Sequence, residues 1–324
     1  MAKQKGAAAS VQPVGVKSGR FQKLKREFKR DRQLWIVSIL ALAFMIVFYL
    51  LPMLGNYMAF IMAFIDYKVR KGFFGSEFVG LKYFKQFWSD PDFWTAFKNT
   101  IMLSFWQILI CFPVPILFAL LVNEIRWGKL KGLVQRVCCF PHFVSVVVAV
   151  SLMMTLVSKD GLVNQIVVNL GGSAKSYMLD SAWFRPLYVI SDIWQEMGWS
   201  AIIYLAAISG VDMQLYEACE IDGGGRLMKL LHITLPCIAG TITIMFILRM
   251  GSIMTVSFDK VLLMQNSNTY NTSDVISTFV YRRGLQGMQY SYATAVGLVE
   301  SVISLFFLGI TNKVSSKLSD TSLF

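Results

Sequence analysis

Residues 216–236 read YEACEIDGGGRLMKLLHITLP, a charged and glycine-rich segment between two hydrophobic stretches of the chain. The carboxylates of Glu217, Glu220 and Asp222 lie within six residues, and three consecutive glycines follow them. An amphipathic run then leads to Leu235-Pro236 at the start of the next hydrophobic stretch. A chain embedded in a bilayer gains nothing from such a segment unless something docks on it, so the segment predicts a docking site.

The composition is that of an integral membrane protein. Of the 324 residues, 55% are hydrophobic and 15% are charged, whereas a soluble domain is typically about 45–50% apolar and about 25% charged. None of the five cysteines has CxxC spacing, and the two histidines are too few for a metal cluster. The sequence therefore indicates neither a disulfide framework nor a metal site.

Hydrophobic stretches predict an all-α protein with about six transmembrane helices. A span needs about 20 mostly apolar residues to cross about 30 Å of hydrocarbon. The candidate spans are 34–60, 99–122, 137–157, 186–208, 237–257 and 293–312. Pro52 and Gly55 predict a kink in the first span, and Asp90-Pro91-Asp92 predicts a helix start before the second.

Basic residues predict the orientation in the membrane. If six spans place both termini on one side, that side holds 18 Lys and Arg against 12 on the other. The positive-inside rule then places both termini in the cytoplasm of a multi-pass protein of the cell (inner) membrane. Ten of the 18 lie in residues 1–33, where they suit anionic lipid rather than nucleic acid.

We expect three parts along the chain. Residues 1–33 form a basic cytoplasmic tail, in which 21–33 has the periodicity of a short amphipathic helix. Residues 34–318 form the transmembrane domain, which includes the polar loop 209–236. Residues 319–324 form a C-terminal tail.

The opening segment resembles the EAA loop of binding-protein-dependent ABC importer permeases. The pattern is carried by Glu217, Ala218, Gly223, Ile233, Leu235 and Pro236, and Cys219 replaces the third small residue. The order of further landmarks is similar to the oligosaccharide and polysaccharide branch of this family. They include LPMLGNYMAFIMAFIDY (51–67), WFRPLYVISDIWQEMGW (183–199) and VYRRGLQGMQYSYATAVGL (280–298). Within that branch the chain most resembles the larger permease of bacterial alginate importers.

This resemblance implies a type I, maltose-permease-like fold and a set of partners. These are a second homologous permease, two ATP-binding cassette subunits and an extracytoplasmic solute-binding protein, all working in a lipid membrane and without nucleic acid. The sequence has no G-x-x-x-x-G-K-[ST] motif, so we expect no ATPase activity from this chain. It should bind no cofactor, because ATP and magnesium would sit on the partner ATPase.

The resemblance also assigns the polar loop to coupling with the ATPase. A short helix at about 216–224 would insert into a cleft of that partner. Small residues would permit close approach, carboxylates would meet basic groups, and the glycines would end the helix. The residues with this expected role are Glu217, Ala218, Cys219, Asp222, Gly223 and Pro236.

Charged residues inside the spans are costly and mark functional candidates. Asp192 and Glu196 lie four residues apart on one helix face, while Arg249 and Glu300 lie in the middle of later spans. In one interpretation Arg249 neutralises carboxylates in a structural network. In the other, polar and aromatic groups line a wet sugar pathway, with the candidates Asn56, Tyr57, Asp192, Trp194, Glu196, Trp199, Tyr204 and Glu300. Three acids against one arginine argue against a polyanionic solute.

Alternative functions receive less support. A permease of this family for a non-sugar solute stays open, but the long outer loops and the landmarks favour sugar. A secondary transporter would leave the polar loop without a role, and no inverted repeat is visible. A membrane-embedded enzyme would need a catalytic set, and neither HExxH nor GxSxG occurs.

Overall fold

The computed structural model describes residues 32–50 and 60–318. The chain divides into two units, residues 1–59 and 60–324. The described part is almost wholly helical, and its one sheet pairs β1 (Ile65–Asp66) with β2 (Glu77–Phe78) in antiparallel register. The kink expected at Pro52 and Gly55 lies outside the described residues, and so do residues 21–31 of the amphipathic helix expected at 21–33.

The first unit contains one apolar helix, α2 (Arg32–Met45), which continues as the π-helical turn η1 (Ile46–Leu50). Its large apolar side chains are exposed on every face, including Leu40, Phe44 and Tyr49. A helix that is hydrophobic all round is typical of a membrane span.

The second unit begins its spans with a long helical path. After α4 (Lys82–Trp88), α5 (Pro91–Trp106), the π-turn η2 (Gln107–Cys111) and α6 (Pro113–Asn123) follow one another almost without a break. Asp90 caps α5 by accepting a hydrogen bond from the Asp92 amide at 3.0 Å, as its sequence predicts. Pro113 lacks the N–H that would continue the α-helical ladder, which explains the π-turn just before it.

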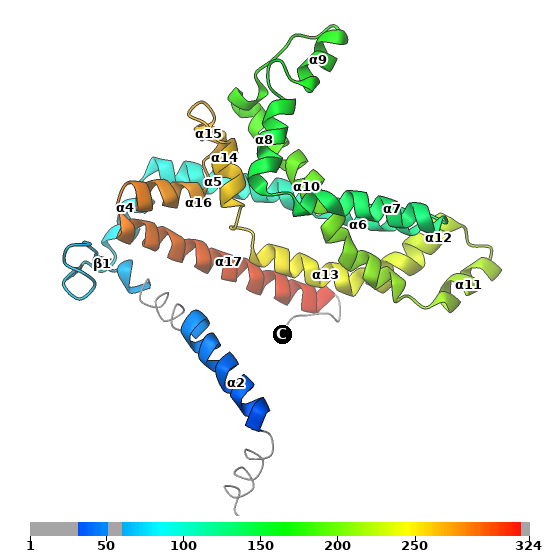
Figure 1. The fold of residues 1–324 in the computed structure, drawn as a ribbon, viewed down its shortest axis with the longest axis horizontal. Coiled ribbons are helices and arrows are strands. Elements are labelled where there is room, and N and C mark those ends of the chain that lie inside the picture. Colours follow the sequence, from blue (N-terminus) through cyan, green and yellow to red (C-terminus); the bar gives the residue numbers. More distant parts are fainter. Residues whose placement is uncertain (1–31, 51–59, 319–324) are drawn as a thin grey trace, which may run out of the picture. The chain divides into compact units, whose positions relative to one another are not determined.

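The predicted span 137–157 is not one continuous helix. Helix α7 (Gly128–Cys139), the short 3-10 helix η3 (Phe140–Phe143) and α8 (Val146–Leu156) form a pair bent by 101°. Pro141 interrupts the ladder, and Ser145 starts a new helix by capping the Val148 amide. Beyond the bend, α8 leads to α9 (Leu162–Asn169), which stands away from the long helices in Figure 1, and then to η4 (Tyr177–Leu179), which contacts α10.

Helix α10 (Ser181–Ser209) packs along α6 and α7. Its 29 residues are long enough to cross a bilayer, at about 1.5 Å per residue. At Gly198 the backbone of α7 comes so close that an added Cβ would collide with the carbonyl of Cys138. Small residues at helix contacts allow this kind of approach in membranes.

The polar loop folds into α11 (Met213–Ile221), α12 (Arg226–Lys229) and the π-turn η5 (Leu230–Thr234), which runs into α13 (Leu235–Gly251). The fifth predicted span extended to residue 257, but the helix ends at Gly251. Residues 252–254 form a turn and 255–257 have no regular structure, and Ser252 donates to the carbonyl of Arg249 at 3.0 Å.

The last part of the chain returns through short helices to a long one. These are α14 (Phe258–Met264), α15 (Tyr270–Ser273), α16 (Ile276–Val280), the π-turn η6 (Tyr281–Gln286) and α17 (Tyr290–Leu318). Helix α17 lies beside α13 (Figure 1).

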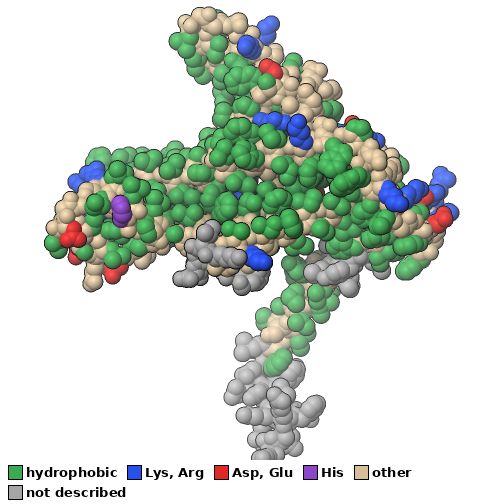
Figure 2. All heavy atoms as spheres, turned by 180° about the vertical axis from the view of Figure 1, so that it is seen from behind, with side chains coloured by type: hydrophobic (Ala, Val, Ile, Leu, Met, Phe, Trp, Pro, Cys, Tyr) green, Lys and Arg blue, Asp and Glu red, His purple; other side chains and the backbone are tan. Residues whose placement is uncertain are grey.

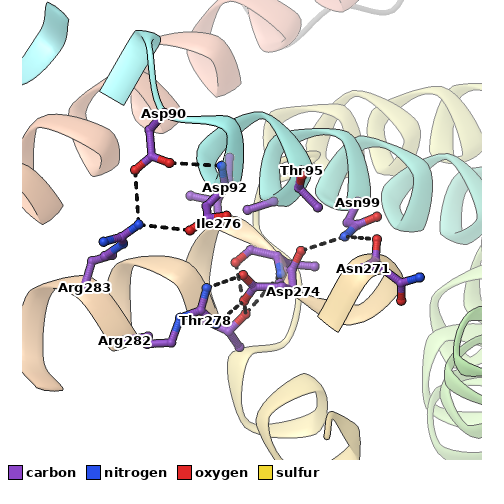
Figure 3. Close-up of polar contacts among 12 residues, drawn as sticks. Asp90, Asp92, Thr95, Asn99, Asn271, Asp274, Ile276, Thr278, Arg282 and Arg283 are labelled. Atoms are coloured by element: carbon purple, nitrogen blue, oxygen red, sulfur yellow. Dashed lines mark hydrogen bonds and ion pairs between the residues drawn. The ribbon is translucent and has the colours of Figure 1, made fainter. Parts of the chain in front are cut away.

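Hydrogen bonds and ion pairs connect α5 with the segment that contains α15, α16 and η6 (Figure 3). Arg282 donates two hydrogen bonds to the carboxylate of Asp274, at 3.1 and 2.6 Å. Asn99 of α5 donates to the backbone carbonyl of Asp274 at 3.0 Å, and Arg283 contacts Asp92 at 2.9 Å. The Asn99–Asp274 and Asp92–Arg283 bonds join residues 175 and 191 positions apart in sequence, whereas the Arg282–Asp274 bonds hold the second segment together.

By length and composition, three described helical stretches can cross a membrane: Pro91–Asn123, Arg226–Gly251 and Tyr290–Ser316. If the bent pair of α7–η3 and α8 forms one span, the number is four. Helix α10 is also long enough to cross a bilayer, but it carries Arg185, Asp192 and Glu196 and is not one of these stretches. Apolar side chains cover the middle of the face in Figure 2, where charged ones are sparse. The predicted all-helical membrane fold with several spans is confirmed, and the number six stays a prediction.

Candidate transport cavity and coupling segment

A cavity of about 570 Å³ lies among η2, α10, α13 and the segment 252–260. Its wall includes residues midway along α10 and the two ends of η2, Gln107 and Cys111. The π-turn therefore lies at the cavity, where it turns Gln107 toward α10. Such turns are frequent at functional sites.

Asp192 lies in this wall and is bound from two sides. Lys260 of α14 makes an ion pair with its Oδ1 at 3.0 Å, and Gln107 donates to its Oδ2 at 3.1 Å. The Lys260 ammonium also lies 5.6 Å from the ring centre of Tyr188. Lys260 is only 3% exposed, and a buried charge requires such partners because its desolvation is costly.

Glu196 also lines the cavity, one turn further along α10. Its Oε2 is 3.0 Å from Nδ1 of His142, which belongs to η3. The ring of His142 stacks on Trp199, with centroids 4.4 Å apart and planes 2° apart. The sequence placed Glu196 near aromatic side chains, and in the structure His142 connects Glu196 with Trp199. The break between α7 and α8 brings His142 to this position.

Arg249 lines the same cavity from the last turn of α13. Among the ion pairs of the described residues Arg249 has no carboxylate partner, so the interpretation in which Arg249 neutralises carboxylates stays a prediction. Lys260 takes that position beside Asp192. Residues of the segment 252–260 line the cavity, and this segment brings Lys260 to it as a second cation beside Arg249.

The other pathway candidates are dispersed. Tyr204 lines the cavity, but Trp194 lines a separate apolar cavity of about 490 Å³ between α8, α9 and α10. Glu300 is half-buried on α17 and is not part of the cavity wall. Asn56 and Tyr57 lie outside the described residues.

Sequence reasoning missed Lys260, Gln107 and His142. The predicted spans 237–257 and 293–312 leave residues 258–292 as a connecting loop, so the sequence gives Lys260 no place inside the membrane domain. A signal for burial was present, since Lys260 is followed by the apolar run VLLM. Gln107 and His142 give no comparable signal, because their roles depend on helix breaks.

The polar loop 209–236, called the coupling segment below, contains a helix with a well-defined start and end. Helix α11 begins three residues earlier than predicted, because Asp212 accepts a hydrogen bond from the Gln214 amide and caps it. Its end is a Schellman motif. The Gly224 amide donates to the Cys219 carbonyl at 2.7 Å, and the Gly223 amide donates to the Glu220 carbonyl at 3.1 Å. Gly223 has a φ of +77°, as this motif requires. The predicted helix stop at the glycines agrees with this geometry.

The side chains of this segment differ in what they contact. Glu220 is paired with Lys229, whose hydrogen bond lowers the pKa of the Glu220 carboxyl. Glu217, Ala218, Asp222 and Pro236 are exposed, and Cys219 is half-buried. Ile221 of α11 is 86% exposed and Leu227 of α12 is 69% exposed. Exposed apolar and acidic groups side by side suit a surface that another protein covers, and the role of each residue stays a prediction.

Replacing Gly223 by alanine should loosen the end of α11. An L residue in the left-handed region costs about 1–2 kcal/mol, equivalent to a five- to thirtyfold change in opening. Hydrogen exchange of the Gly224 amide should accelerate by about that factor. Gly225→Ala is the matched control, because Gly225 has a φ of −79° and open space at its Cβ. Equal exchange in both variants would contradict the role of the Gly223 conformation.

Comparisons with known proteins place this geometry in a family. No family model matches the chain. The polygalacturonan/rhamnogalacturonan transport system permease protein YteP of Bacillus subtilis (strain 168) is 38% identical over 318 residues, 98% of each chain. Protein LplB of the same strain is 40% identical over 297 residues, 91% of this chain and 92% of its own length.

Solved structures agree with these relatives. A bacterial ABC transporter involved in the import of the acidic polysaccharide alginate has a chain that matches with a TM-score of 0.81 and 35% identity, covering 92% of this chain and 99% of that one. A bacterial alginate ABC transporter has also been solved in complex with an alginate pentasaccharide-bound periplasmic protein. Its matching chain gives the same TM-score and identity over 93% of this chain and 100% of its own.

The chain belongs to the permease subunits of bacterial ABC transporters, in the branch of oligosaccharide and polysaccharide permeases. It is a multi-pass membrane permease and not an ATPase. The family resemblance, the fold class and the membrane localisation predicted from sequence are therefore confirmed.

Proposed function

We propose that this permease moves an oligosaccharide or polysaccharide from a solute-binding protein into the cytoplasm, using energy from a partner ATPase. The observation that carries the proposal is the cavity among the long helices, whose wall holds four charged side chains, Asp192, Glu196, Arg249 and Lys260. Its volume lies in the range of small-molecule sites, about 300–1,000 Å³. Carboxylates and amides in such a wall can accept and donate hydrogen bonds to sugar hydroxyls.

The energy would enter through α11. Glu217 faces solvent and has no ion pair among the described residues, so its carboxylate is free for a basic group of an ATPase. Closure of two ATPase subunits would move α11, and η5 and α13 would pass that movement on because they continue directly from α12. Arg249 lies at the far end of α13, so the same helix joins the coupling segment to the cavity wall. ATP and magnesium would be held by the partner.

The wider assembly is part of this proposal. It comprises a second homologous permease and two ATPase subunits in addition to the solute-binding protein. The bound periplasmic protein in the related alginate transporter supports the last of these partners. Alginate or its oligosaccharides are a candidate solute, on the strength of the structural neighbour at 35% identity.

Reconstitution tests the proposal. The chain would be assembled in proteoliposomes with its cognate permease, ATPase and binding protein. Uptake of labelled alginate, galacturonan and neutral oligosaccharides would be measured, together with uptake of amino acids and phosphate. We expect ATP-dependent uptake of at least one sugar. ATP-dependent uptake of an amino acid or phosphate but of no sugar would contradict the proposal, and uptake without any ATPase would point to a secondary transporter.

Glu196→Gln should reduce sugar uptake more than it reduces the stability of the complex. The amide can still contact His142, so the fold loses little, but a sugar hydroxyl loses a charged acceptor. We expect about a fivefold loss of uptake, equal to roughly 1 kcal/mol between a charged and a neutral hydrogen bond. Uptake and thermal unfolding would be measured on the same preparation, with Asp160→Asn as an exposed control. Normal uptake with early unfolding would make Glu196 a structural residue.

A further inference from the structure

The charged side chains at the cavity differ in whether a protein group of opposite charge or a hydrogen-bond partner contacts them. Asp192 is neutralised by Lys260 at 3.0 Å and accepts a hydrogen bond from Gln107. Glu196 has His142 at 3.0 Å. Each acid at the cavity therefore already has a partner. The sequence alone leads to a different expectation, because it places three acids and only one arginine in the predicted spans.

Arg249 is the cation at this cavity without such a partner. It lines the wall with both acids, but neither carboxylate lies within 4 Å of its guanidinium among the described ion pairs. Arg249 lies in the last turn of α13, near the end of the stretch Arg226–Gly251 that can cross a membrane. Because no protein anion pairs with it among the described ion pairs, its N–H donors at the cavity are available to a solute.

We propose that Arg249 binds a carboxylate of the transported sugar and so makes the permease selective for acidic, uronate-containing oligosaccharides. This inference rests on the proposed function and names the substrate class of the same cavity. The guanidinium is planar and presents a fork of N–H donors that matches a carboxylate in two parallel hydrogen bonds. A neutral hydroxyl uses only one of those donors and brings no charge.

Lys260 does not compete for this role. It is 3% exposed, its ammonium is held by Asp192, and the ring of Tyr188 lies 5.6 Å away. Binding a solute carboxylate there would require breaking a buried ion pair. Arg249 needs no such rearrangement, since its guanidinium has no ion pair to give up.

The position of Arg249 also connects binding to transport. It lies in the last turn of α13, which follows the coupling segment through η5 without a break. A carboxylate held by Arg249 would therefore be bound to the helix that the ATPase moves. The acids that face it stand on α10, so movement of α13 changes the distance between the bound carboxylate and Asp192 and Glu196.

The test compares two sugars of equal size in the complete reconstituted importer. The probes are trisaccharides of galacturonate and of mannuronate, each with its methyl ester, in which the carboxylate charge is removed. The variants are Arg249→Gln, Arg249→Lys and, as an exposed control on α5, Lys98→Gln. Each variant is compared with wild type for each sugar, so that any preference of the binding protein cancels.

We expect Arg249→Gln to lower uptake of the acidic trisaccharides about tenfold or more, as loss of a charge-assisted hydrogen bond implies, and to change uptake of the esters less than about twofold. Arg249→Lys should recover part of the acidic uptake, and Lys98→Gln should change neither. Equal losses for acid and ester, or no loss for either, overturn the inference. Wild-type uptake of neutral sugars alone also overturns it while the proposed function stands, and wild-type uptake of no sugar overturns both.

Discussion

Glu217→Lys should abolish ATP-driven sugar uptake while the protein still inserts and assembles at normal abundance. Glu217 is exposed on α11 and makes no ion pair within the described residues, so its replacement removes no internal contact. The change would place a cation where a basic group of the ATPase is expected. It would remove a charged contact worth roughly 1.5–3 kcal/mol and add repulsion, which is a large loss at a single docking helix.

The measurement is uptake and sugar-stimulated ATP hydrolysis in proteoliposomes, with the amount of assembled complex determined in parallel. Glu77→Lys is the matched control, because Glu77 is also an exposed acid but belongs to β2. We expect Glu217→Gln to have an intermediate effect. Normal uptake by Glu217→Lys in a fully assembled complex would show that α11 does not dock through this residue.

Lys260→Met should lower the free energy of unfolding by about 3–5 kcal/mol, the range for removing one partner of a buried ion pair. The Asp192 side chain is 16% exposed and would lose its cation while remaining among α10, η2 and α14. Gln107 would be left as a hydrogen-bond donor to an otherwise unpaired carboxylate. The melting temperature of the purified complex should fall clearly.

A double variant separates the charge effect from the loss of packing. Lys260→Met with Asp192→Asn removes both charges, and the amide oxygen can still accept from Gln107. We expect the double variant to regain most of the stability lost by Lys260→Met. If Lys260→Met unfolds at the wild-type temperature, or if the double variant is no better than the single one, the ion pair does not hold α14 in place.

Much of the class and fold could be predicted from the sequence because the signals are local. A run of about 20 apolar residues specifies a span wherever it occurs, and Asp90-Pro91 specifies a helix start through its own cap. The order Glu217, Ala218, Gly223 and Pro236 depends only on spacing along the chain. Relatives and solved structures confirm the family that this order indicated.

The break within the predicted span 137–157 was harder to predict. Pro141 stands near the middle of an apolar run, and proline in a membrane helix can be accommodated in several ways. Its neighbours decide the outcome, here with a 101° bend that brings His142 to Glu196 and Trp199. None of these contacts is encoded by periodicity.

The sequence by itself determined that this is a helical membrane permease with a polar segment for a partner, because apolar length and motif spacing are properties of neighbouring residues. Only the tertiary structure decided which charges meet. Lys260 reaches Asp192 across 68 positions, and Gln107 reaches it across 85. Electrostatic pairing depends on distances of a few ångströms, which the packing of α10 against η2 and α14 sets. The same packing gives both cavity acids their partners and leaves Arg249 without one.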